Sequence, residues 1–409
     1  MQHNASCRSC GGSRLNEVIS LGKTPLANAL LNESQLSQPE PRWMLDLVRC
    51  LDCSLVQITE TVPPESMFSD YAYFSSFSDT MVSHARTIAE RLVDQRGLEA
   101  SSQVIEIASN DGYLLQWYAK RNVPVLGIEP ARNIAKVAIE QRAIPTISDF
   151  FGIKLALALA EQGLVADVIH ANNVLAHVPD LNGVVEGLKA LLKPGGRVVV
   201  EAPYLGDLID HVEFDTIYHE HLCYFSLTAL VALFARHGLD IVDVERLAIH
   251  GGSLRIFAAH ASTESISSAV GSLLKNESTW VHCEEHHQRF ASRVEDLRQS
   301  LIERLQDLKA AGNRIAVYGA SAKGSTLMNY FGIDAKLIDY VVDRSTVKQG
   351  RYTPGTHLKI YDPQRLLDDQ PDYCLLLTWN FAEEIMLQQA SYRANGGKFI
   401  IPVPEVRVA

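Results

Sequence analysis

The sequence predicts an α/β protein in which a small N-terminal metal-binding module precedes two Rossmann-like, doubly wound domains. Short apolar strands alternate with amphipathic helices over residues 103–259, and the same alternation begins again at residue 314. Two C-x-x-C motifs near the N-terminus are typical of a small module held together by a metal ion. The expected parts are the module at 1–66, a central domain at 67–262, a helical connector at 263–311 and a second Rossmann-like domain at 312–409.

In the N-terminal module, Cys7 and Cys10 form one C-x-x-C pair, and Cys50 and Cys53 form the other. Two such pairs can place four thiolates around one tetrahedral ion, which leaves no open position for chemistry. We therefore expect a structural zinc site, because a module of this size buries too little apolar surface to fold alone. Unrelated free thiols or a redox couple are the alternatives.

The central domain should begin with a helix over 78–96, where Met81, Ile88 and Leu92 recur at helical spacing. Apolar runs that end in small or polar residues then mark its strands, and amphipathic segments mark its helices. We expect strands at 104–107, 124–128, 144–147, 167–170, 197–201, 240–247 and 253–259, and helices at 112–117, 133–142, 181–192 and 226–236.

The connector should be one long helix, because apolar residues repeat at helical spacing from 284 to 310 and the pattern ends at Gly312. The second Rossmann-like domain follows from a shorter version of the same alternation. Its expected strands are 314–318, 337–342, 373–377 and 398–401, with a helix at 325–331.

Composition excludes several classes of function. The 409 residues carry 37 Lys and Arg against 48 Asp and Glu, a formal net charge of −11, which disfavours binding along nucleic-acid phosphates and anchoring on anionic lipids. No apolar run approaches the roughly 20 residues of a membrane-spanning helix, and the first residues lack the pattern of a signal peptide. We expect a cytoplasmic protein, monomeric or weakly homo-oligomeric, that binds neither nucleic acid nor membranes.

A ligand site is expected where the parallel strands of the central domain end. The first strand ends in small residues around Ala108 but has no G-x-G-x-x-G, which disfavours a dinucleotide. The next two strands end in Glu129 and Asp149; a carboxylate such as Glu129 can accept both hydroxyls of a ribose, and an acidic pocket suits a cationic ligand. The residues expected to hold the ligand are Glu106, Ala108, Asn110, Gly112, Glu129, Pro130, Asp149, Phe150 and Asn172.

The order EIASNDG, GIEP, SDF, ANNVLAHV and LLKPGGRVVVEAP resembles a class I S-adenosylmethionine-dependent methyltransferase. The chain departs from the usual first motif at Ala108, where glycine is common. This resemblance implies S-adenosylmethionine as the cofactor of the central domain.

The reacting groups are expected in Tyr218-His219-Glu220-His221, after the fifth strand. The two imidazoles are two residues apart, whereas zincins use H-E-x-x-H, so we favour acid–base catalysis over a metal. On an extended backbone both imidazoles would share one side, but in a loop this rule fails. A carbon nucleophile needs a base and a donor for the enolate oxygen. Either imidazole can be the base, Tyr218 or His177 can hold the oxygen, and Glu220 can fix a tautomer or bind a hydroxyl.

Further motifs, namely TPLANALL (24–31), YAYFSSFS (71–78), YHEHLCYFS (218–226), HGGSLR (250–255) and GASAKGSTLMNYFG (319–332), make the whole chain resemble the deoxysugar C-methyltransferases. That family methylates carbon 3 of NDP-4-keto-deoxyhexoses to make branched-chain sugars. The resemblance implies an N-terminal zinc module, a central S-adenosylmethionine domain, a C-terminal domain without its own cofactor, and a sugar nucleotide bound between the domains.

Carried onto this chain, the resemblance implies that His221 removes the C3 proton. Tyr218, Glu220, His177 and a tyrosine of the 71–73 pair would position the sugar and stabilise the enolate, which then attacks the methyl group. We assign Tyr73 to catalysis, and the substrate-binding residues are expected to be Tyr71, Asn173, Tyr204, Ser321 and Lys323, the last two at the diphosphate. A plain strand–helix turn at 319–324 is the alternative to this diphosphate site. An O- or N-methyltransferase and a non-catalytic scaffold remain as alternatives.

Overall fold

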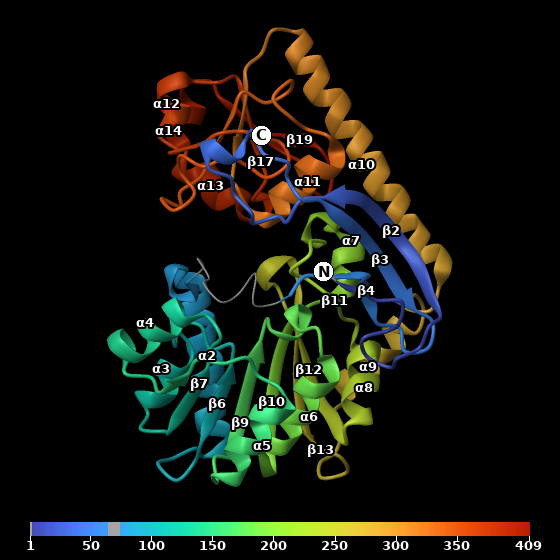
Figure 1. Ribbon diagram of the computed structural model, residues 1–409, viewed down its shortest axis with the longest axis vertical. Helices are drawn as coiled ribbons and strands as arrows, with labels where there is room; N and C mark the ends of the chain where they lie inside the picture. The colour runs from blue at the N-terminus through green and yellow to red at the C-terminus, as the bar shows by residue number, and fades with distance from the viewer. Residues whose placement is uncertain (1, 64–73) are drawn as a thin grey trace.

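The computed structural model describes residues 2–63 and 74–409 and contains three principal sheets (Figure 1). Tyr71 and Tyr73, which the sequence assigned to the active site, lie outside the described residues. Of the helices in the described ranges, none is both long enough and apolar enough to cross a membrane.

The central domain contains a seven-stranded sheet in the order β12-β13-β10-β9-β6-β7-β8. Pairing is parallel from β10 to β8, and β13 joins β10 antiparallel. This arrangement confirms the expected doubly wound fold. The strands are β6 (Val104–Ile107), β7 (Val125–Ile128), β8 (Thr146–Ile147), β9 (Ala166–Asn172), β10 (Leu192–Pro203), β12 (Leu239–Leu247) and β13 (Ser253–His260).

Consecutive strand residues point to opposite faces of this sheet. Both faces carry apolar residues, and helices cover both. Val104 and Val168 pack into one apolar cluster with residues of α2 and α3, whereas their neighbours Ile105 and Ile169 pack into the other with residues of α5, α6 and α8. The helices are α2 (Asp79–Arg96), α3 (Leu115–Ala119), α4 (Arg132–Arg142), α5 (Ile153–Glu161), α6 (Leu181–Leu191), α7 (Leu205–Asp210), α8 (Leu227–Arg236) and α9 (Ser268–Glu277).

The start of β10 differs from the expected boundary, and the structure shows how α8 is capped. Residues 193–196, which separate the expected helix 181–192 from the expected strand 197–201, lie within β10, which begins at Leu192 and has a register shift before Arg197. Ser226, the first residue of the expected helix 226–236, caps α8, because its hydroxyl accepts the N–H of Ala229.

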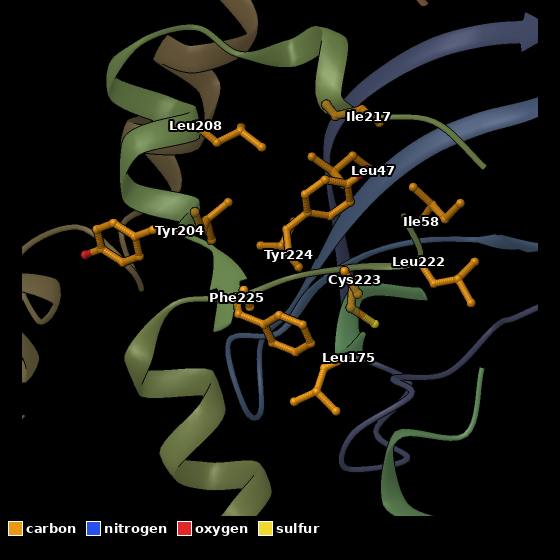
Figure 2. Packing of buried hydrophobic residues seen from close by; sticks show 14 of the residues in the cluster. Leu47, Ile58, Leu175, Tyr204, Leu208, Ile217, Leu222, Cys223, Tyr224 and Phe225 are labelled. Carbon is orange, nitrogen blue, oxygen red and sulfur yellow. The ribbon is translucent and has the colours of Figure 1, made fainter. Parts of the chain in front are cut away.

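The N-terminal module forms a four-stranded antiparallel sheet in the order β11-β4-β3-β2. Its outer strand β11 (Cys223–Tyr224) comes from the central domain and begins two residues after His221, the last residue of the Tyr218–His221 segment. Around β11, Leu222 and Tyr224 lie close to Leu47 and Ile58 of the module (Figure 2). The other strands are β2 (Leu15–Thr24), β3 (Trp43–Cys50) and β4 (Val56–Ile58), and β1 (Gln2–His3) pairs with β5 (Glu60–Thr61).

The C-terminal domain has a six-stranded sheet, parallel except for its last strand, in the order β16-β15-β14-β17-β18-β19. The connector is the expected long helix, α10 (Glu284–Ala310), which runs along one side of the molecule (Figure 1). The remaining elements are β14 (Ile315–Tyr318), α11 (Ala322–Phe331), β15 (Tyr340–Val342), β16 (Ile360–Tyr361), α12 (Arg365–Asp369), β17 (Tyr373–Leu376), α13 (Ala382–Gln388), α14 (Ala390–Ala394), β18 (Lys398–Ile401) and β19 (Arg407–Val408).

A buried histidine in β9 makes the fold sensitive to acid. The Nε2 atom of His170 lies 2.8 Å from the Tyr118 hydroxyl, and burial lowers the pKa of His170 from 6.5 to about 3. Below pH 6.5, His170 takes up a proton in the unfolded chain but stays neutral in the folded protein. The contribution of His170 to the free energy of unfolding is therefore highest above pH 6.5 and falls progressively as the pH decreases below it. We expect about 2 kcal/mol of unfolding free energy to disappear between pH 7 and pH 5 through this residue.

Urea unfolding of the wild type and of His170→Gln at both pH values measures this loss. The variant should lose less stability on acidification than the wild type. Equal losses in the two proteins would show that His170 takes up no proton on unfolding.

Candidate active site

A cavity of about 540 Å³ lies where the central sheet, the N-terminal module and the C-terminal domain meet. Its walls include the last residues of four strands of the central sheet, as expected for an open α/β sheet. These residues are Ile107 of β6, Ile128 of β7, Asn172 of β9 and Pro203 of β10. The module contributes Asn28, and the C-terminal domain contributes Lys323 and Asn380.

One end of the cavity carries most of the residues expected to hold a cofactor. The Glu129 carboxylate accepts the backbone N–H of Asn110 at 2.9 Å and of Ala131 at 2.8 Å, while burial raises its pKa. Ala108 and Asn110 adopt positive φ angles of 51° and 48°, a conformation that glycine adopts more easily. The first motif therefore keeps a glycine-like backbone at Ala108 although glycine is absent. The expected residues that line the cavity are Ala108, Asn110, Glu129, Pro130, Phe150 and Asn172.

Three expected cofactor residues are not among those that line the cavity. Glu106 is fully buried in β6, where burial and the carboxylates of Glu129 and Asp111 raise its pKa well above its usual value. Gly112 has a packing role, because a Cβ atom there would lie 3.0 Å from Ile144. Asp149 accepts the N–H of Phe150, the residue that does line the cavity.

The other end of the cavity brings the expected reacting groups together. The Nδ1 atom of His221 lies 2.9 Å from the carbonyl oxygen of Thr216, so Nδ1 must carry a proton and donate it. In the neutral ring Nε2 is then an acceptor, and the Tyr218 hydroxyl donates to it at 2.9 Å. This tautomer suits His221 to take up a proton at Nε2.

His177 lies beside His221, with ring centroids 4.8 Å apart. Its Nδ1 atom donates to the carbonyl oxygen of Glu220 at 2.7 Å, and burial lowers its pKa from 6.5 to about 4. His177 is therefore neutral near pH 7, and both imidazoles line the cavity with their Nδ1 atoms held by backbone carbonyl groups.

The second imidazole of the H-E-H motif does not join this group. His219 is buried, and its Nε2 atom lies 3.1 Å from the carbonyl oxygen of Met44 in β3. The segment is a turn, so the two-residue alternation of a strand does not apply to His219 and His221. Of the two imidazoles of the H-E-H motif, His221 is therefore the one placed to act as the base. His219 connects the segment to the N-terminal module.

Glu220 is buried and lines the cavity. Burial raises its pKa, and the Asn28 side chain opposes this shift by donating a hydrogen bond of 2.6 Å to Oε1. Asn28 lies within the 24–31 motif, but nothing in the local sequence pattern singled it out. Thr216 and Asn380 also line the cavity without having been expected.

The expected substrate residues are placed differently from one another. Asn173 and Lys323 line the cavity. Tyr204 is buried away from it, with its ring beside Trp280 and under the guanidinium of Arg246, and Figure 2 shows the ring pointing away from the β11 cluster. Ser321 caps α11 by accepting the N–H of Gly324.

The ammonium group of Lys323 lies near a carboxylate and an aromatic ring. Its Nζ atom lies 3.8 Å from Glu213 Oε2 and 4.8 Å from the ring centroid of Trp379. Trp379 in turn donates to the buried Asp215 at 2.7 Å. Glu213 and the ring of Trp379 therefore lie beside this lysine at the junction of the central and C-terminal domains, and Asp215 interacts with it electrostatically.

The four cysteines of the module converge as the sequence predicted. Their Sγ atoms all lie within 4.8 Å of one another, and this is the one such cluster of possible metal ligands among the described residues. The N–H groups of Ser9 and Asp52 donate to Cys7 and Cys50, each at 3.4 Å, which favours thiolates. The donor set and its geometry fit a structural zinc ion with four sulfur ligands.

Three families of known proteins match successive parts of the chain, and one relative matches almost all of it. Residues 7–68 match a family described as a zinc binding domain, 81–244 a methyltransferase domain, and 248–404 a C-methyltransferase C-terminal domain. The C-methyltransferase NovU of Streptomyces niveus is 37% identical over 404 residues, which cover 98% of this chain and 96% of NovU.

More distant matches cover parts of the chain. A ubiquinone biosynthesis O-methyltransferase of Acinetobacter baylyi is 29% identical over 24% of this chain and 42% of its own. The solved structure of magnesium protoporphyrin IX methyltransferase from Synechocystis aligns with 47% of this chain and 90% of its own at 16% identity, with a TM-score of 0.37. The full-length match to NovU and the matched family domains show that the chain is an S-adenosylmethionine-dependent methyltransferase that belongs to the C-methyltransferase family.

Proposed function

We propose that this C-methyltransferase deprotonates carbon 3 of an NDP-4-keto-deoxyhexose and methylates the resulting enolate. The observation that carries the proposal is the convergence of His221, Tyr218, His177 and Glu220 on one wall of the cavity that contains Glu129. A C–H beside a ketone is acidic enough for an imidazole base only if donors stabilise the enolate oxygen. The wall offers such a base together with a hydroxyl donor and a carboxylate.

The hydrogen bond between Tyr218 and His221 links deprotonation to enolate stabilisation. Before the reaction, the Tyr218 hydroxyl donates to Nε2 of His221. The hydroxyl must turn away from Nε2 before this nitrogen can take the C3 proton, and it can then donate its own proton in a hydrogen bond to the 4-oxygen of the sugar. Glu220 would accept a hydroxyl of the sugar, and Tyr73 would complete the site.

The cofactor would occupy the other end of the cavity, against Ala108, Asn110, Glu129 and Asn172. The Oδ1 atom of Asn172 is buried and has no hydrogen-bond partner among the described residues, which fits a polar ligand at this end. When bound, S-adenosylmethionine supplies an electrophilic methyl group on a cationic sulfur.

For the sugar nucleotide we propose Asn173, Lys323 and Tyr71 as contacts, with the diphosphate near the start of α11. The packed ring of Tyr204 gives it no role at the sugar.

Hydrogen exchange tests the proposal most directly. In D₂O without S-adenosylmethionine, the enzyme should exchange the C3 hydrogen of its NDP-4-keto-deoxyhexose, and with the cofactor the product should gain one methyl group on carbon 3. A panel of thymidine and guanosine diphosphate sugars, read by mass spectrometry, identifies the substrate. Methyl transfer to an oxygen or nitrogen without C3 exchange would overturn the proposal.

A further inference from the structure

The N-terminal module reaches into the active site through one side chain. Asn28 lies on the segment that follows β2, and its Nδ2 atom donates to Glu220 Oε1 at 2.6 Å, although the two residues are 192 positions apart. Among the described residues, no other side chain donates a hydrogen bond to the Glu220 carboxylate. The contact therefore joins the module to the wall of the cavity that carries the reacting groups.

The segment that carries Asn28 is fixed at both ends. On one side Thr24, the last residue of β2, pairs with Trp43 of β3. On the other side Leu31 forms two backbone hydrogen bonds with Tyr352 of the C-terminal domain, each of 2.9 Å. Asn28 thus projects from a short bridge between two folded parts, which limits how far its amide can move.

The same module supports the neighbours of Glu220. Met44 accepts a hydrogen bond from His219, and the N–H of Ile58 donates to the carbonyl oxygen of Leu222 at 3.0 Å. These contacts position the backbone of the turn on both sides of Glu220. The contact from Asn28 is different, because it acts on the carboxylate itself.

We infer that Asn28 is a positioning residue of the active site, which holds one oxygen of the Glu220 carboxylate so that the other is presented to a sugar hydroxyl. The inference rests on the proposed role of Glu220 in the sugar site. It gives the module a part in catalysis that adds to its part in folding. The hydrogen bond also favours the ionised carboxylate, which burial disfavours.

Asn28→Ala and Asn28→Asp test the inference against the control Asn32→Ala, an exposed asparagine four residues further along the same segment. We expect Asn28→Ala to raise the KM for the sugar nucleotide about tenfold, as for the loss of one hydrogen bond to a charged group, with the KM for S-adenosylmethionine unchanged. Asn28→Asp keeps the shape but places a second carboxylate beside Glu220, so it should be more damaging. Asn32→Ala should resemble the wild type.

A second measurement needs no substrate. The pKa of the Glu220 carboxyl group can be followed by ¹³C NMR of glutamate-labelled protein, with Glu220→Gln for assignment. It should rise in Asn28→Ala and rise further in Asn28→Asp, and the acid limb of kcat/KM should move to higher pH in parallel. A Glu220 pKa that is the same in all three proteins overturns the inference.

The two proposals fail in distinguishable ways. If the wild type neither exchanges nor methylates any 4-keto sugar, the proposed function fails, while the NMR titration still decides whether Asn28 acts on Glu220. If the wild type is active and Asn28→Asp keeps normal kinetics, the role of Asn28 fails alone.

Discussion

Replacing His221 with alanine is expected to lower kcat by about 10²–10⁴-fold, the usual contribution of a positioned general base. The carbonyl group of Thr216 fixes the tautomer of the His221 ring, and the Tyr218 hydroxyl donates to the accepting atom Nε2. The variant therefore removes a base that is already oriented. S-adenosylmethionine affinity, measured by calorimetry, should be nearly unchanged, because the residues expected to hold the cofactor lie at the ends of the central strands and not in the turn that carries His221. Exchange of the C3 hydrogen in D₂O should be lost together with methyl transfer.

The matched control is His219→Gln, in the same turn. His219 bonds to the Met44 carbonyl group outside the cavity, and a glutamine can keep an N–H donor there. This variant should retain most of the turnover. Near-normal C3 exchange in His221→Ala would show that His221 is not the base. The neighbouring neutral imidazole of His177 would then be the candidate base.

The fold was predictable from the sequence because its strands have strong local patterns. Val104 and Ile105, or Val168 and Ile169, are buried on opposite faces of one sheet, and such runs read as parallel strands covered on both sides. What the pattern could not show is that β11, which lies in the chain segment of the central domain, would pair with β4 of the module. A two-residue strand has too little periodicity to reveal its partner.

The site was predictable where chemistry is concentrated in one short run or at strand ends. His221, Tyr218, Glu220 and Glu129 were found in this way, and all of them line the cavity. Position at a strand end does not fix where a side chain points, however, which is why Tyr204 packs elsewhere. Asn28 could not be found, because its contact depends on how two segments 192 residues apart meet in space.

Replacing Cys7 with serine is expected to abolish stable folding of the module and with it most of the soluble protein. Structural zinc contributes about 10–16 kcal/mol of binding free energy in small peptides, whereas whole domains are stable by only about 5–15 kcal/mol. Metal analysis should find one zinc ion per wild-type chain and far less in the variant, and thermal unfolding should begin at a lower temperature.

Cys283→Ser is the control, because Cys283 lies outside the cluster and serine suits its position before α10. It should keep both zinc and stability. Since β11, Met44 and Asn28 connect the module to the Tyr218–His221 turn, any Cys7→Ser protein that remains soluble should also have lost C3 exchange. A zinc-free variant that folds normally and still exchanges the C3 hydrogen would contradict both the metal site and the dependence of the active site on the module.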